Sequence, residues 1–235
     1  MQPFCLNAKT IADAWFQLIY NIFDNSYKQN IQKGSFEKEQ YRLQYPGIAV
    51  FIEHPGEDMI PIIPPSLGIP SPTTMEYIED YFANYLMDPQ LGENETYKYS
   101  SRIHNPMPKG GTQLERVIDT LKNTPLTNQA IVEIGSPEDH DVCIGNDGNL
   151  DPPCLRLLDF KAVPNGDDLL LTVTAYFRSW DLWAGFPSNL GGLELLKQYV
   201  AGETGLKSGP MYAYSAGAHI YGYQEELAKL RTLRK

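Results

Sequence analysis

The chain has 235 residues and a formal net charge of −10, with 42% hydrophobic residues and three cysteines that form no CxxC pair. This charge argues against broad DNA binding, no apolar run reaches the ~20 residues of a membrane span, and the N-terminal sequence lacks the pattern of a signal peptide. We therefore expect one cytoplasmic domain over residues 1–235 with no metal site and no DNA or membrane partner.

The first half of the chain predicts two helices, a strand and a loop. Apolar residues at helical spacing predict a helix over 10–23, and a strand follows at 47–53. Residues 61–72 are too rich in proline for a helix or strand and predict a surface loop that could serve as a lid. A second helix begins behind this loop, where Thr73 and Glu76 have the spacing of a capping box.

The second half mixes helices with strands. Thr112 and Glu115 predict a second capping box. The other expected elements are a strand at 130–135, a hairpin of 154–163 and 169–177 with Asn165-Gly166 between its strands, a helix at 188–200, and a strand end and helix from 219 onward. Since strands and helices do not alternate strictly, we predict an α+β fold with a mixed, mainly antiparallel sheet packed with helices.

The hairpin gives Cys154 a possible partner. If the hairpin is centred on Gly166, Cys154 lies opposite Arg178, and directly opposed residues have Cβ atoms ~5 Å apart. A nearby cation lowers the pKa of a thiol and raises its thiolate fraction. Two alternatives stay open: the register slips by a residue or two, or Cys154 is a buried structural cysteine.

Polar residues gather behind the second strand of this hairpin. Ser179 and Asp181 follow at the strand end, where α+β folds often place their chemistry. Gly191 and Gly192 then open the predicted helix, which suggests that a ligand lies flat against its first turn. Asn189 could bind that ligand or cap the helix.

Four sequence elements in order resemble the thymidylate synthase superfamily, most closely its archaeal-type branch. They lie in "DPPCL", in "YFRSWDLWAGFPSNLGGLELLKQYV" (an Arg-Ser-x-Asp and a Pro-x-Asn element) and in "AHIYGYQEELAKL", within a region from about Tyr97 to about residue 230. The resemblance implies C5 methylation of dUMP to dTMP and a possible homodimer. The implied one-carbon donor is 5,10-methylenetetrahydrofolate or 5,10-methylenetetrahydromethanopterin.

The resemblance also implies roles for individual residues. Cys154 corresponds to the nucleophile that adds to C6 of the pyrimidine, as in covalent catalysis generally. The implied roles are proton transfer at C5 for Tyr99, phosphate binding for Arg178 and Ser179, and contact with the deoxyribose hydroxyl for His219 and Tyr221. Asn189 corresponds to a catalytic residue that pairs with the pyrimidine N3 and O4. Asp181 corresponds to a catalytic aspartate at the pyrimidine and pterin end of the site, and Gly185 to a cofactor contact.

The chain departs from the family pattern at two functional positions. Asn128 stands where the family usually carries a phosphate-binding arginine, so Arg42 and Arg102 are candidates to replace it. The catalytic glutamate has no clear counterpart. Glu76 and Glu79 are the nearest candidates on a helix, and two solvated surface carboxylates are an equally good interpretation.

Three functions remain open at this stage. The leading one is dUMP methylation. A pyrimidine nucleotide C5 hydroxymethylase acting on dUMP, dCMP or CMP would share the nucleophile and the donor. A non-catalytic nucleotide- or RNA-binding relative is the third, favoured by Asn128 and disfavoured by the intact Cys154. The donor and acceptor groups of Asn189 suit uracil, whereas a cytosine-directed relative would favour aspartate there.

Overall fold

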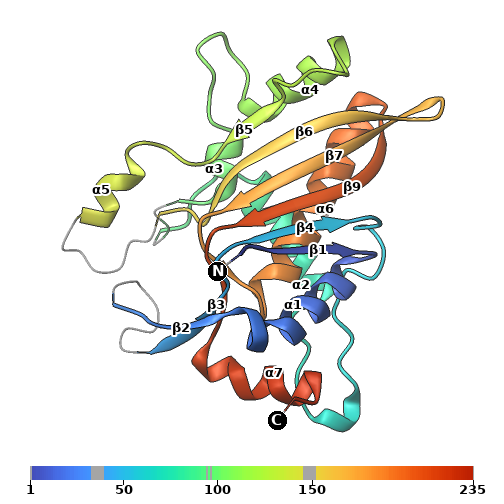
Figure 1. Cartoon of the computed structure of the whole chain (residues 1–235). Coiled ribbons are helices and arrows are strands. Elements are labelled where there is room, and N and C mark those ends of the chain that lie inside the picture. Colours follow the sequence, from blue (N-terminus) through green and yellow to red (C-terminus); the bar gives the residue numbers. More distant parts are fainter. Residues whose placement is uncertain (1, 33–39, 94, 96, 145–151, 235) are drawn as a thin grey trace.

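The computed structural model describes residues 2–32, 40–93, 95, 97–144 and 152–234, with the backbone alone at 142–144 (Figure 1). Its strands form two sheets. The larger has the order β1 (Phe4–Ala8), β4 (Ile48–Ile52), β9 (Lys207–Ser215), β7 (Asp168–Phe177), β6 (Leu155–Asn165) and β5 (Ile131–Glu133). The smaller has the order β2 (Tyr27–Asn30), β3 (Tyr41–Gln44), β10 (Ala218–Tyr221) and β8 (Trp180–Asp181).

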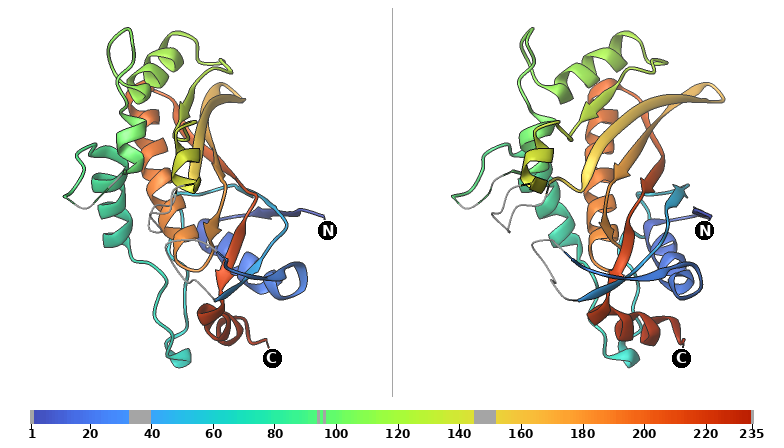
Figure 2. Two further views of the ribbon diagram at one scale, coloured as in Figure 1. Left: turned by 90° about the vertical axis from the view of Figure 1, so that its left-hand side faces the viewer. Right: turned by 60° about the vertical axis from the view of Figure 1, so that its left-hand side comes forward.

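Helices cover one face of the larger sheet (Figure 2). The α-helices are α1 (Ile11–Asn25), α2 (Met75–Asp80), α3 (Tyr99–Ile103), α4 (Gln113–Asn123), α5 (Asp139–Ile144), α6 (Gly185–Thr204) and α7 (Glu225–Thr232). The α+β class is confirmed, with parallel and antiparallel pairs in both sheets. No helix in the described part of the chain is long and apolar enough to cross a membrane.

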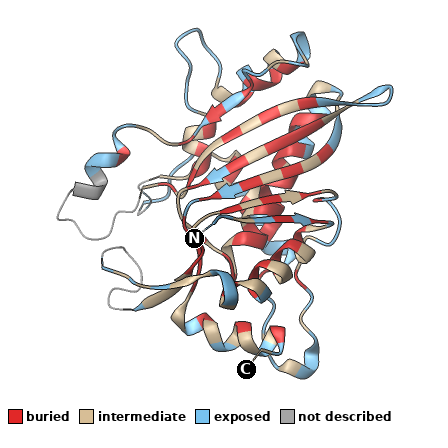
Figure 3. Ribbon diagram, in the orientation of Figure 1, coloured by how far each residue is buried: buried red, intermediate tan, exposed pale blue. Residues whose placement is uncertain are grey.

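The core lies between the sheet and these helices. Alternate residues of β6 and β7 are buried, as a sheet with one covered face requires (Figure 3). Strand β9 lies between β4 and β7 and was missed in the sequence, where Gly209-Pro210 reads as a chain break. The β7–β9 register shifts between Leu171 and Val173, so Pro210 is accommodated at an irregularity of the ladder.

The β6–β7 hairpin forms as predicted, with a correction to its turn. Its two-residue loop is Gly166-Asp167, because Asn165 pairs with Asp168. The body of the hairpin is therefore offset by one position from a register centred on Gly166. A bulge at Arg156 removes this offset, so that Leu155 pairs with Phe177.

The helix ends agree with the sequence in two places and differ in a third. Thr10 caps α1, and Thr112 forms a capping box with Glu115 at α4. The capping box predicted at Thr73 is wrong. Thr74 caps α2, because the Thr73 hydroxyl is bonded to Ser188 instead, at 2.8 Å. Beyond α2 the helix continues as a π-helix, η2 (Tyr81–Met87), a form that is found frequently at functional sites.

Helix α6 is longer than predicted, which corrects the interpretation of its glycines. It begins at Gly185, so Asn189 lies in its second turn and is not its cap. Gly191 and Gly192 lie inside the helix. A Cβ atom at Gly191 would be 2.7 Å from Ile78, and one at Gly192 would overlap the Tyr81 ring. The two glycines therefore let α2 and η2 pack closely, and no ligand needs to lie there.

Candidate active site

Cys154 lies immediately before β6, at the open end of the hairpin away from its turn, and is half-buried. The backbone N–H of Arg178 donates to the Cys154 carbonyl at 2.8 Å. The predicted opposition of Cys154 and Arg178 is therefore confirmed at the backbone. The bulge at Arg156 produces it, since the register of the hairpin body alone would place these residues one position apart.

The guanidinium group of Arg178 is held against the chain that leads to Cys154. Its Nε donates to the Pro153 carbonyl at 3.2 Å, and its Nη2 donates to the Pro152 carbonyl at 2.5 Å. These bonds fix the Pro152-Pro153 segment relative to the end of β7. They also keep a positive charge next to the segment that leads to Cys154.

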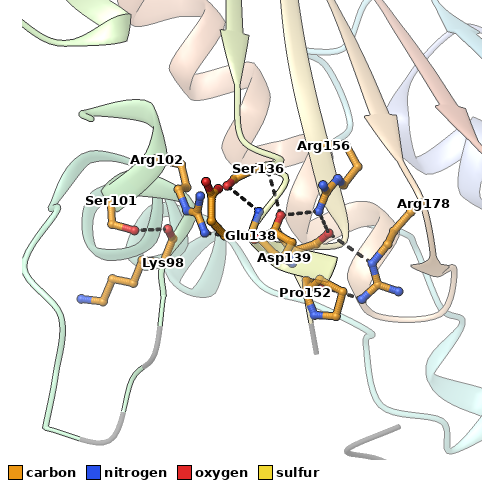
Figure 4. A network of polar contacts seen from close by, with 10 residues as sticks. Lys98, Ser101, Arg102, Ser136, Glu138, Asp139, Pro152, Arg156 and Arg178 are labelled. Carbon is orange, nitrogen blue, oxygen red and sulfur yellow. Dashed lines mark hydrogen bonds and ion pairs between the residues drawn. The ribbon is translucent and has the colours of Figure 1, made fainter. Parts of the chain in front are cut away.

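Two more arginines belong to the same network of polar contacts as Arg178 (Figure 4). Arg156 and Arg102 donate to opposite oxygens of Asp139, at 2.6 and 3.0 Å. Although burial opposes it, the Ser136 backbone N–H and the two guanidinium groups hold the pKa of Asp139 below its ordinary value. An ionised Asp139 neutralises one charge, so the cluster of Arg102, Arg156 and Arg178 keeps positive charge near Cys154.

The position of Arg156 depends on a glycine. The Arg156 carbonyl accepts from the backbone N–H groups of Ile134 and Gly135, and a Cβ atom at Gly135 would overlap the Arg156 guanidinium. The guanidinium thus passes over a position without a side chain and reaches Asp139. Arg156 was not predicted as a site residue, although its place two residues after Cys154, the expected nucleophile, was a signal that could have identified it.

Three tyrosines lie near Cys154. The hydroxyl of Tyr99 accepts from the Leu155 backbone N–H at 3.2 Å, next to Cys154. Burial raises the pKa of Tyr85 to about 12 and that of Tyr99 well above its ordinary value, and electrostatic interactions with neighbours, among them Cys154, act in the same direction. Burial and the charges of Asp181 and Cys154 raise the pKa of Tyr221 to about 12. All three phenols are therefore neutral hydrogen-bond donors at neutral pH.

Asn189 and Asp181 face the same region from α6 and β8. The Asn189 Oδ1 atom accepts from the indole N–H of Trp180 at 3.0 Å. The carboxylate of Asp181 accepts from three backbone N–H groups, those of Trp183, Ala184 and Gly185, each at 3.1 Å. Asp181 therefore holds the turn that begins α6, and this turn places Asn189.

The smaller sheet contributes His219, Tyr221 and Arg42. His219 is 2% exposed, and its Nδ1 lies 2.8 Å from the Gly217 carbonyl, so Nδ1 carries the proton and Nε2 is an acceptor. Burial lowers the pKa of His219 to about 4. The ring of His219 packs edge-on against Tyr221, which pairs with Arg42 in the adjacent strand. Among the described residues, His219 Nε2 and Arg42 Nε have no hydrogen-bond partner.

A cavity of about 460 Å³ adjoins Asn189. It is lined by Pro72, Thr73, Thr74, Tyr77, Ala184, Gly185, Ser188 and Asn189. Its volume suits a small organic ligand. One wall is the end of the proline-rich loop, whose other end is held where Arg231 donates to the Ile62 carbonyl. The lid role of this loop stays a prediction.

The remaining candidates contribute less to this arrangement. Glu76 and Glu79 are exposed on α2, as the surface interpretation of these residues expects. Asn128 is exposed before β5, and Ser179 is half-buried between β7 and β8. Of the predicted residues, the structure thus brings Tyr99 and Tyr221 near Cys154. It adds Tyr85 near Cys154 and Trp180 beside Asn189, neither of which was predicted as a site residue.

Comparisons with known proteins agree with the fold. A family model described as thymidylate synthase matches residues 78–235. A "Putative thymidylate synthase" of Methanococcoides burtonii is 31% identical over 219 residues, which cover 93% of this chain and 89% of that protein. A "Putative thymidylate synthase" of Methanosarcina acetivorans is 28% identical over 224 residues, which cover 95% of this chain and 92% of that protein. The structure of thermostable thymidylate synthase A from Bacillus subtilis superposes with a TM-score of 0.67 at 15% identity, covering 97% of this chain and 85% of that one.

Proposed function

The chain belongs to the thymidylate synthase family of methyltransferases, and on this premise we propose that it converts dUMP to dTMP with a 5,10-methylene-tetrahydropterin as donor. The donor supplies the one-carbon unit and the hydride. One observation supports the proposal most. Cys154, just before the start of β6, lies opposite Arg178 and near the neutral phenols of Tyr85, Tyr99 and Tyr221.

In the proposed reaction the Cys154 thiolate adds to C6 of uracil, and the electron pair moves to an enolate whose C5 becomes nucleophilic. C5 then forms the bond to the one-carbon unit. Loss of the C5 proton breaks the bond between that unit and the donor nitrogen and leaves an exocyclic methylene on C5. Hydride from the tetrahydropterin adds to this methylene as Cys154 leaves C6, so the methyl group forms and the tetrahydropterin is oxidised to a dihydropterin. Tyr99 is suited to organise this proton transfer: its oxygen already accepts from the Leu155 N–H, so its own proton is available to a water or to substrate.

The arginine cluster is the proposed phosphate site. Arg178 and Arg156 both approach the Pro153 carbonyl, at 3.2 and 3.5 Å, so their guanidinium groups are neighbours. Arg102 reaches them through Asp139. We propose that these groups bind the dUMP phosphate, with Ser179 adding a hydroxyl, and that Arg156 and Arg102 replace the arginine absent at Asn128. Arginine suits this task because its planar donors match phosphate oxygens.

The proposed sugar site is the smaller sheet. The unprotonated Nε2 of His219 can accept from the deoxyribose hydroxyl, and the Tyr221 phenol can donate to it. Arg42 lies beside them and leaves its Nε available to the ligand. Asn189 is proposed to form hydrogen bonds with N3 and O4 of the pyrimidine.

The cavity beside Asn189 is the proposed donor site. Gly185 and Ser188 form its α6 wall and Tyr77 offers an exposed aromatic ring, so the residues present fit a flat heterocycle such as a pterin. Asp181 holds the turn that carries Gly185. Folate and methanopterin donors share this pterin, so the cavity suits both.

We further propose that residues 1–235 form one domain and that it pairs as a homodimer. Residues before the family match are bonded to those within it, as in Trp15 Nε1 to the Trp183 carbonyl at 2.9 Å. The uncovered sheet face carries aromatic side chains, among them Tyr176 and Tyr214, which are 36% and 40% exposed. Sedimentation at several concentrations tests the dimer. The cytoplasmic location stays a prediction.

Product mass tests the function. The protein is incubated with dUMP, dCMP and either methylene-tetrahydropterin, with Cys154→Ser as the inactive variant and Cys5→Ser, at an exposed cysteine, as its matched control. A gain of one CH2 on dUMP that needs Cys154 supports the synthase. A gain of CH2O instead assigns a hydroxymethylase, and binding without any turnover or exchange of the C5 hydrogen leaves a nucleotide-binding protein.

A further inference from the structure

Trp180 is held rigidly beside the residue proposed to read the base. It is 2% exposed, its ring stacks on Phe177 with centroids 4.0 Å apart and planes 6° from parallel, and Phe186 packs against it at 4.7 Å. Its indole N–H donates to Asn189 Oδ1 at 3.0 Å. An indole nitrogen can only donate, so the ring presents a fixed donor to Asn189.

A fixed donor decides which way the Asn189 amide points. The oxygen and nitrogen of a carboxamide have nearly the same shape, so an amide without such a partner can present either group to a ligand. Turning the Asn189 amide over would put its N–H against the indole N–H of Trp180 and leave this buried donor without an acceptor, which is costly. Trp180 thereby holds Oδ1 on its own side.

We propose that Trp180 is a specificity-determining residue: by fixing the Asn189 amide, it makes the site select a 4-oxo pyrimidine and reject a 4-amino pyrimidine. This inference rests on the proposed function, in which Asn189 pairs with the base. Uracil donates from N3 and accepts at O4, which matches the free lone pair of Oδ1 and an Nδ2 hydrogen. Cytosine accepts at N3 and donates from its amino group, so both contacts are reversed and only an overturned amide could satisfy them.

Binding measurements test the proposal without relying on turnover. Trp180→Phe keeps an aromatic ring on Phe177 and removes the donor. Trp15→Phe is the matched control, because it also deletes one buried indole hydrogen bond, to the Trp183 carbonyl. Dissociation constants for dUMP and dCMP are measured by calorimetry on each protein.

The wild type is expected to prefer dUMP. In Trp180→Phe this preference falls by roughly tenfold to a hundredfold, the range set by one unsatisfied buried donor, mainly because dCMP binds more tightly. Trp15→Phe keeps the wild-type ratio. A folded Trp180→Phe with an unchanged ratio overturns the proposal, while dUMP that fails to bind the wild type overturns the proposed function and this inference with it.

A spectroscopic measurement on the wild type covers the case in which Trp180→Phe does not fold. With ¹⁵N-labelled tryptophan, the indole N–H of Trp180 is expected to exchange slowly with solvent and to stay protected when dUMP saturates the protein. Loss of that protection on dUMP binding would mean that Asn189 turns away from Trp180, and the proposal would then be wrong.

Discussion

Acidification is expected to destabilise the protein through His219. Burial lowers the pKa of this imidazole to about 4, with the positive charge of Arg42 acting in the same direction, although the Gly217 carbonyl and Asp181 oppose it. An unfolded histidine has a pKa of about 6.5. Between these values the unfolded chain binds a proton that the folded chain excludes, so stability is complete above about pH 6.5 and declines toward pH 4.

The pKa difference sets the size of the effect. At about 1.4 kcal/mol per unit, a lowering from 6.5 to about 4 corresponds to about 3 kcal/mol of unfolding free energy across the whole window. This figure needs little reduction for solvent screening, because His219 is 2% exposed.

The comparison that isolates His219 uses His219→Asn, which can still donate to the Gly217 carbonyl but does not titrate. Urea unfolding at pH 7.5, 6.0, 5.0 and 4.5 gives the free energy of both proteins. The wild type should lose up to about 3 kcal/mol more than the variant as the pH falls. Parallel pH profiles, or an NMR titration of His219 near its ordinary pKa, would refute the reasoning.

Three further outcomes follow from the packing and the charge cluster. Gly192→Ala should lower the free energy of unfolding by about 1–3 kcal/mol, measured in urea, because its Cβ would overlap the Tyr81 ring. Gly202→Ala should raise the free energy of unfolding by about 0.5–1 kcal/mol, because Gly202 lies inside α6 with open space for a Cβ atom. Gly205→Ala should lower it by about 1 kcal/mol, because Gly205 has a φ of +74°. Changes of the same sign in the two variants would contradict this argument from backbone conformation. Arg156→Gln should weaken dUMP binding about tenfold or more and leave deoxyuridine, which has no phosphate, unaffected in calorimetry; equal losses for both ligands would exclude a phosphate contact.

Local patterns predicted those parts of the fold that local interactions decide. The capping box of Thr112 and Glu115 needs only residues of its own helix, and it forms. Strand β9 was missed because Gly209-Pro210 breaks the local pattern, while its position depends on ladders with β4 and β7, which are distant in sequence. Thr73 failed as a cap for the same reason: its partner, Ser188, lies 115 residues away.

The candidate site shows the same limit. The opposition of Cys154 and Arg178 was predicted from a register that the hairpin body does not have, and it holds because one bulged residue, Arg156, restores it. A period-two pattern contains no signal for a bulge. Trp180 and Asn189 are nine residues apart in the sequence. Their hydrogen bond joins a two-residue strand to the interior of a helix, so no helical or strand periodicity predicts it.

The site is built where two neighbouring strands pass together from one sheet to the other. β7 ends at Phe177 and continues as β8 from Trp180, while its parallel neighbour β9 ends and continues as β10 from Ala218. The two crossings are in contact. The backbone N–H of Trp180 donates to the Gly217 carbonyl at 3.1 Å, and a Cβ atom at Gly217 would be 2.8 Å from the Arg178 carbonyl oxygen.

This contact ties the two ends of the proposed nucleotide site together. Arg178 lies in one crossing, beside the thiol and the proposed phosphate site, and Gly217 in the other holds His219 of the proposed sugar site. A shift of one crossing moves the other, because a backbone carbonyl blocks their closer approach and hydrogen bonds oppose their separation. In the proposed site, the spacing between the phosphate-binding and sugar-binding groups is thus set by backbone contacts, which are stiffer than side-chain packing. A site assembled from two sheets in this way would hold the proposed nucleotide in a single pose.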